Sequence, residues 1–285
     1  MDPVKAQTLF YIATLTVSGI VFGLVLFWSI RTLGTNGKAE KEIEPTPRTI
    51  DIIDLLFALT IIFFFYGNTA FIFQNSINPS DASAIKEVKK MTLSEAILNN
   101  IIFLIIGAFV FSFASFARGR NPNQVFGLNK ISWGKVLIWG LGAMIPVYIL
   151  LGLGSVIIQL IIPSKEKVPE MQEIVQTMIS SHDITIRIAL LFSAIIVAPI
   201  IEEIIFRGYI YPVLKRYSHR LFAGFMTSLL FAVVHGHVEG LIPLLLLAII
   251  LTLCYELTGS LLVPILIHAL FNGINSFIIL NLSNG

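Results

Sequence analysis

The chain has 285 residues, of which 56% are hydrophobic and only 13% are charged. Soluble domains carry about twice that share of charge, so this sequence lacks the polar side chains needed to cover a water-soluble globule. The net charge of +2 is too small to indicate nucleic acid as a partner. Composition therefore excludes a soluble protein and a nucleic-acid-binding protein, and it predicts an integral protein of the lipid bilayer.

Eight apolar segments are candidates for membrane-spanning helices, which need about 20 mostly apolar residues. They are residues 8–30, 52–74, 97–117, 136–162, 184–214, 221–236, 240–257 and 260–280. The sixth and seventh are short and have a tight connection, so seven spans with one re-entrant pair are the alternative. The expected fold class is an all-α polytopic membrane protein, with about eight transmembrane helices surrounding a buried polar cavity.

The polar segments between the spans predict their orientation. The residues before the first span are too weakly basic for a secretory signal, so that helix is expected to be retained. With eight spans, Lys and Arg in the connections divide eleven to six between the two sides, and the richer side is expected to be cytoplasmic. In the connection 163–183, apolar residues recur at helical spacing, which indicates an amphipathic helix on the membrane surface, either an interfacial connector or a lid.

The fifth segment carries three charged residues, Glu202, Glu203 and Arg207, in an otherwise apolar run. Ionisable side chains at membrane depth are costly unless they are paired or face a hydrated cavity, so each is a candidate functional residue. Glu203 and Arg207 are four residues apart on one helix face and can form an ion pair, which is either architectural or part of a site. Glu202 points about 100° away from that face, and it is the candidate general base.

Two later segments add polar residues at a similar depth. The sixth carries His235, and the eighth carries His268 and Asn272, which share one helix face. At a rise of about 1.5 Å per residue, Glu202, His235, His268 and Asn272 lie about 19, 21, 12 and 18 Å, respectively, from the helix ends on one side of the membrane, the side expected to be cytoplasmic. One buried site requires such a common depth, so these four side chains are expected to meet in one cavity.

These residues, in this order, resemble the three motifs of the CPBP family, the type II CAAX prenyl endopeptidases and ABI-domain proteins. The motifs are Glu202-Glu203-x-x-x-Arg207, Phe231-x-x-x-His235 and His268-x-x-x-Asn272. The resemblance covers about residues 184–280 and implies a membrane-embedded endopeptidase whose cavity opens to the cytoplasmic side. Residues 136–285 would form the catalytic membrane core, in a single integral unit with the N-terminal helices and loops of residues 1–135.

The resemblance also implies a role for each residue. Glu202 would activate water as a general base with His235 as its partner, and His268 and Asn272 would form the oxyanion hole. Glu203 would orient these residues, and Arg207 would hold Glu203. Peptide hydrolysis without a nucleophilic side chain needs such a base and such donors. The substrate would be a prenylated CAAX-type peptide, cut near its C-terminus, or another membrane-associated peptide.

Three alternatives remain open. Glu202, His235 and His268 could hold a catalytic zinc ion, but the H-E-x-x-H pattern is absent and Asn272 is a poor zinc ligand, so we expect no cofactor. A second alternative is a non-catalytic member of the family, such as a bacteriocin self-immunity factor or a scaffold. A transporter with a Glu/His proton relay would predict an inverted repeat, and the sequence has none.

Overall fold

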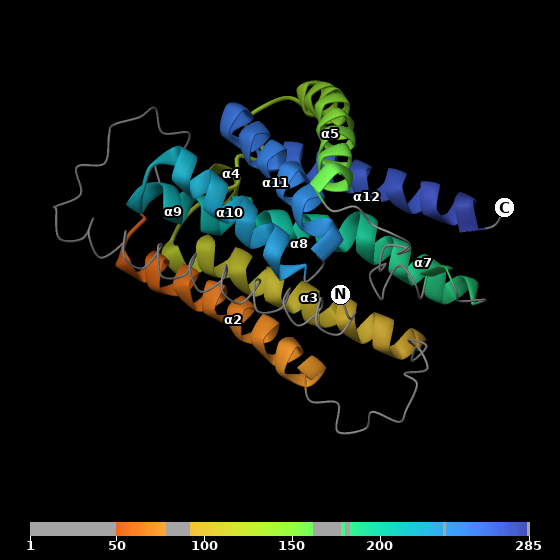
Figure 1. The fold of residues 1–285 in the computed structure, drawn as a ribbon. Helices are drawn as coiled ribbons and strands as arrows, with labels where there is room; N and C mark the ends of the chain where they lie inside the picture. Colours follow the sequence, from red (N-terminus) through yellow and green to blue (C-terminus); the bar gives the residue numbers. More distant parts are fainter. Residues whose placement is uncertain (1–49, 78–91, 162–177, 180–182, 236–237, 284–285) are drawn as a thin grey trace. The chain divides into compact units, whose positions relative to one another are not determined.

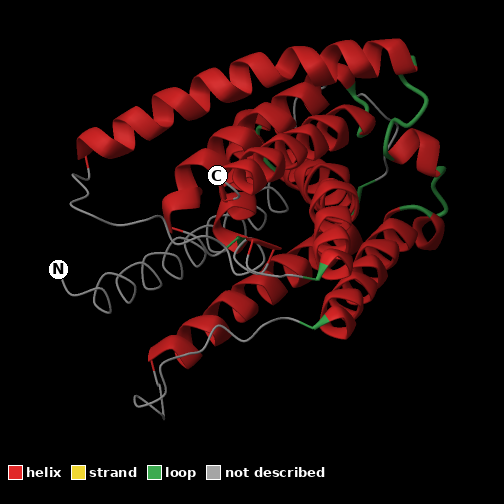
Figure 2. Ribbon diagram, turned by 90° about the vertical axis from the view of Figure 1, so that its right-hand side faces the viewer, coloured by secondary structure: helices red, strands yellow, loops and turns green. Residues whose placement is uncertain are grey.

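The computed structural model describes residues 50–77, 92–161, 178–179, 183–235 and 238–283. Every element in these ranges is a helix (Figure 2), which confirms the all-α fold class. The longer helices are α2 (Ile52–Ile77), α3 (Leu93–Ala114), α5 (Trp133–Ile161), α10 (Arg220–Val234), α11 (Val238–Thr258) and α12 (Leu262–Ser283). Each predicted segment from 52–74 onward falls on helices, whereas segment 8–30 lies outside the described residues.

Within the described ranges, five helical stretches are long and apolar enough to cross a membrane, judged by length and composition. They are Leu93–Arg118, Trp133–Gly154, Ile184–Tyr217, Gly240–Thr258 and Leu262–Asn281. Large apolar side chains stay exposed on them, among them Ile105 (62%), Ile138 (73%) and Phe277 (69%). A lipid environment accommodates such side chains without cost, so the protein is an integral membrane protein, and the count of eight spans stays a prediction.

The described helices, which are labelled in Figure 1, form two compact units that alternate along the chain. One unit holds residues 50–77, 210–235 and 238–248, and the other holds residues 92–161, 178–179, 183–209 and 249–283. In the first unit, α2 packs against α10 and against α9 (Tyr211–Tyr217), and α9 and α10 pack against each other. In the second, α12 packs against α5 and α8 (Ala198–Ile205), and α3 packs against α8 and α7 (Ile184–Phe192).

The fifth predicted segment is not one regular α-helix. Helix α8 has a π-helical turn at each end, η2 (Ser193–Val197) before it and η3 (Phe206–Ile210) after it. At the first turn the backbone N–H of Ala198 donates to the carbonyl of Ser193, five residues back instead of four. Each π turn adds one residue to a helical turn and shifts the faces that follow it. The side chains of α8, among them Glu202 and Glu203, therefore point in directions shifted by about one residue from those of a continuous α-helix.

Two glycines let the connection before α5 approach the turn between α11 and α12. Gly127 has a φ of +61°, and a Cβ atom there would overlap the carbonyl oxygen of Gly259. Gly259 has a φ of +64°, which also favours glycine. Next to this contact the backbone N–H of Leu261 donates to the carbonyl of Phe126 at 2.9 Å. The approach fixes the start of α12, the helix that carries His268 and Asn272.

The connection 163–183 lies mostly outside the described residues, so its predicted amphipathic helix stays a prediction. Its described part includes Met178, which is 3% exposed and packs in a small cluster with Ala96 of α3 and Leu190 of α7. Leu280 of α12 packs against the same cluster. The end of this connection is therefore anchored in the second unit.

Candidate active site

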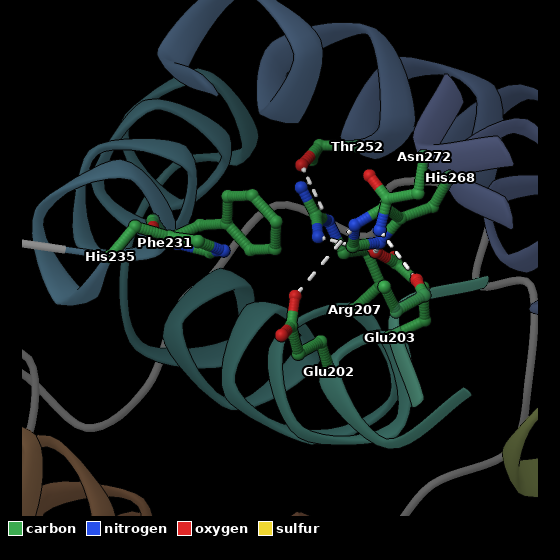
Figure 3. A network of polar contacts seen from close by, with 9 residues as sticks. Glu202, Glu203, Arg207, Phe231, His235, Thr252, His268 and Asn272 are labelled. Carbon is green, nitrogen blue, oxygen red and sulfur yellow. Dashed lines mark hydrogen bonds and ion pairs between the residues drawn. The ribbon is translucent and has the colours of Figure 1, made fainter. Parts of the chain in front are cut away.

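The predicted ion pair on the fifth segment forms. Arg207 donates a hydrogen bond from Nη1 to Oε1 of Glu203 at 2.7 Å, and both side chains are fully buried (Figure 3). A buried ion pair is stable only when the two charges stay bonded to each other and also make further polar contacts. The pair therefore needs polar neighbours from other helices.

His268 of α12 is one such neighbour and contacts both glutamates. Its Nδ1 atom lies 3.0 Å from Oε1 of Glu203, and its Nε2 atom lies 3.8 Å from Oε2 of Glu202. Because an ionised carboxylate oxygen accepts only, Nδ1 carries the proton and donates it to Glu203. One oxygen of Glu203 thus accepts from both Arg207 and His268, and the second nitrogen of His268 is turned toward Glu202.

Asn272 lies one turn after His268 on the same face, as the spacing predicts. Its Nδ2 atom donates a hydrogen bond to the backbone carbonyl of Ala194, in π turn η2, at 2.8 Å. Helix α12 is therefore joined to the fifth segment at two points, through His268 to Glu203 and through Asn272 to Ala194. One Asn272 N–H is used in this bond, and the other N–H of the amide remains as a donor.

Thr252 of α11 is a member of the network that sequence reasoning missed. Its Oγ1 atom accepts a hydrogen bond from Nε of Arg207 at 3.4 Å, and its side chain is 5% exposed. The sequence signal is weak because a threonine in an apolar helix often bonds to its own backbone, as Thr258 does to the carbonyl of Cys254 at 2.7 Å. Sequence reasoning also missed the carbonyl of Ala194 as a partner of Asn272. The one sequence signal for this partner is Pro199, five residues later.

His235 ends α10 and belongs to the other unit. Its Nδ1 atom lies 2.6 Å from the carbonyl oxygen of Phe231, and its ring packs against the Phe231 ring with centroids 4.7 Å apart. A carbonyl accepts only, so Nδ1 is the protonated nitrogen and Nε2 carries the lone pair in the neutral ring. Because His235 and Glu202 lie in separate units, their expected pairing stays a prediction.

The zinc alternative requires Glu202, His235 and His268 as ligands of one ion. In the part of the chain that it describes, no group of three or more His, Cys, Asp or Glu side chains is arranged to hold a metal ion. Nδ1 of His268 is engaged with Glu203, which leaves Nε2 as its one atom for any further ligand. The expectation that the protein needs no cofactor stays a prediction.

The helices that form this network lie in a segment that matches a family model. Residues 184–274 match the Rce1-like family model. That family is described as type II CAAX prenyl endopeptidase Rce1-like, and the matched segment contains all six residues predicted for the site. The resemblance to the CPBP family, stated above from the motifs, is thereby confirmed for this segment.

A curated relative agrees with the family match. The chain is 35% identical over 77 residues to a protein of Bacillus subtilis (strain 168) named "Putative membrane peptidase YdiL". The match covers 27% of this chain and 32% of the relative, so it spans about a third of that protein's length. No solved structure matches the chain significantly.

Proposed function

We propose that the protein is a membrane-embedded endopeptidase that uses an activated water molecule as its nucleophile. The observation that carries the proposal is the position of His268 between two adjacent glutamates, with Nδ1 bonded to Glu203 and Nε2 3.8 Å from Glu202. A purely architectural ion pair accounts for Glu203, Arg207 and a polar neighbour such as His268. It gives no reason for a second carboxylate, Glu202, beside the same histidine at membrane depth.

In the proposed mechanism Glu202 takes a proton from water, and the water oxygen attacks the carbonyl carbon of the scissile peptide bond. The tetrahedral intermediate that forms carries its negative charge on the former carbonyl oxygen. When the carbon–nitrogen bond breaks, the proton passes from Glu202 to the leaving amine. His235 is proposed as the partner of Glu202 in these proton transfers.

His268 and Asn272 are proposed to stabilise the oxyanion. With both ring nitrogens protonated, His268 donates from Nδ1 to Glu203 and from Nε2 toward the site. Asn272 donates through the Nδ2 hydrogen that does not bond to Ala194. Donors fixed in advance by such contacts need no reorganisation during the reaction, and removing one of them typically lowers kcat by about 100- to 1000-fold.

The proposed substrates are peptides held at the membrane, either prenylated CAAX-type C-termini or other membrane-associated peptides. Two features support this class: the family that the segment matches, and the position of the network on helices that are long and apolar enough to span the bilayer. The site is proposed to open to the cytoplasmic side, where Lys and Arg of the connections are concentrated.

Cleavage of defined peptides tests the proposal. The full chain, purified in detergent, is incubated with prenylated and unprenylated C-terminal peptides, and mass spectrometry locates the cut. Glu202→Gln should abolish cleavage. Glu95→Gln is the matched control, because Glu95 serves a capping box at the start of α3 that glutamine also satisfies. If the folded protein cuts none of these peptides, the non-catalytic immunity or scaffold role is favoured instead.

The reaction is proposed to need no metal ion. Glu202 can activate water directly, and Asn272 is a better oxyanion donor than zinc ligand. Cleavage should therefore continue in excess chelator. Activity that is lost to the chelator and restored by zinc would support the zinc-dependent alternative with Glu202, His235 and His268 as ligands.

A further inference from the structure

The carbonyl oxygen of Ala194 lacks the backbone donor that it would have in a regular helix. In a regular α-helix this oxygen would accept from the N–H of residue 198, four positions later. Here the N–H of Ala198 donates to Ser193 instead. In a π turn the donor would be residue 199, which is a proline and has no N–H.

The side chain of Asn272 takes the place of the missing backbone donor. Its Nδ2 atom donates to the Ala194 carbonyl at 2.8 Å, across 78 residues of sequence. Because a carbonyl oxygen accepts only, the bond decides which end of the amide faces η2 and which end faces away from it. Without such a bond, the two orientations of an asparagine amide fit the same space about equally well.

The helix packing supports a fixed contact at this point. Helix α12 packs directly against η2, and a Cβ atom on Gly273 would lie in ordinary contact, 3.9 Å from Ile195. The helices therefore approach each other beside Asn272 closely enough to keep its amide in place.

We propose that Pro199 and the π turn Ser193–Val197 act together as a clamp that sets the orientation of the Asn272 amide. Pro199 is then a positioning residue for the proposed peptidase, on whose activity the kinetic part of this inference rests. An N–H at position 199 gives the Ala194 carbonyl a backbone donor, which is residue 199 itself if the turn stays π-helical and Ala198 if the turn closes as an α-helix. The carbonyl of Ala194 is then occupied, and Asn272 loses the bond that orients it.

The first test reads the Asn272 side chain without any assay of activity. The full chain is labelled with ¹⁵N-asparagine in detergent micelles, and the NH₂ signals of Asn272 are assigned by their loss in Asn272→Ala. Pro199→Ala should shift these signals, and Pro199→Ser supplies the same N–H if the alanine variant is poorly produced. Pro146→Ala is the matched control, because Pro146 also lies inside a membrane helix, α5, and is exposed. Unchanged Asn272 signals in the Pro199 variant would overturn the clamp.

The second test is a double-mutant cycle on peptide cleavage. Pro199→Ala should lower kcat by about tenfold with little change in KM, less than complete loss of an oxyanion donor. In the Asn272→Ala background the same change should have no further effect, because Pro199 acts through Asn272. Effects that multiply would show that Pro199 acts elsewhere. A wild-type protein without activity would refute the proposed peptidase, while the NMR result would still decide the clamp.

Discussion

Removal of Arg207 gives the sharpest test of the buried network. Arg207→Met keeps an unbranched side chain that replaces the apolar stem of arginine, but it leaves the carboxylate of Glu203, which is fully buried, without the donor at 2.7 Å. Breaking a buried ion pair by removing one partner typically costs about 3–5 kcal/mol. His268 still donates to the same oxygen at 3.0 Å, so we expect the lower end, about 3 kcal/mol, which is roughly a 150-fold change in the unfolding equilibrium.

A double variant separates stability from activity. Arg207→Met with Glu203→Leu removes both charges, and replacing a whole buried pair by apolar side chains is often neutral or stabilising. We expect stability within about 1 kcal/mol of the wild type. Peptide cleavage should be lost in the double variant, because Nδ1 of His268 has no acceptor to orient its ring.

Unfolding by SDS titration in mixed micelles, followed by circular dichroism, measures both variants. Arg187→Met is the matched control, because Arg187 is half-buried in the same spanning stretch and donates to the carbonyl of Ile179 at 3.1 Å. Loss of that single hydrogen bond should cost about 1 kcal/mol. If Arg207→Met costs no more than this control, or if the double variant is as unstable as Arg207→Met, the unpaired carboxylate of Glu203 is not the source of the instability.

Three further outcomes are expected. His235→Ala should abolish peptide cleavage while the far-UV spectrum and elution volume stay unchanged, and retained turnover would remove His235 from the mechanism. Cleavage by the wild type should survive dialysis against a chelator, as judged by metal analysis and rate together. Gly127→Ala should destabilise the protein by at least about 2 kcal/mol, since the residue has a φ of +61° and meets the Gly259 carbonyl. Gly134→Ala, with nothing within 4 Å of the added atom, should be neutral or slightly stabilising in the same titration.

Features that depend on local composition and helical periodicity could be predicted from the sequence. The low share of charge predicted the membrane class, and the apolar runs predicted the positions of the described helices from α2 to α12 except the short α4 (Pro122–Val125), which lies in a polar connection. The i, i+4 spacing predicted that Glu203 pairs with Arg207 and that His268 shares a face with Asn272. These predictions hold because residues four apart lie close together in any α-helix, whatever surrounds it.

Local patterns could not predict the two π turns around α8. A π turn differs from an α-helical turn by one residue in the spacing of its hydrogen bonds. The sequence signal of the first π turn, Pro199, is equally compatible with the first turn of a regular helix. The same difference decides that the carbonyl of Ala194 is available to a side chain.

What the sequence determined by itself was the kind of protein and the list of polar residues at membrane depth. Tertiary structure decided which atoms of these residues meet. Thr252 contacts Arg207 across 45 residues, His268 contacts Glu203 across 65, and Asn272 contacts Ala194 across 78. Each contact depends on how two helices approach and rotate against each other, which is set by packing along their whole length and has no local signature.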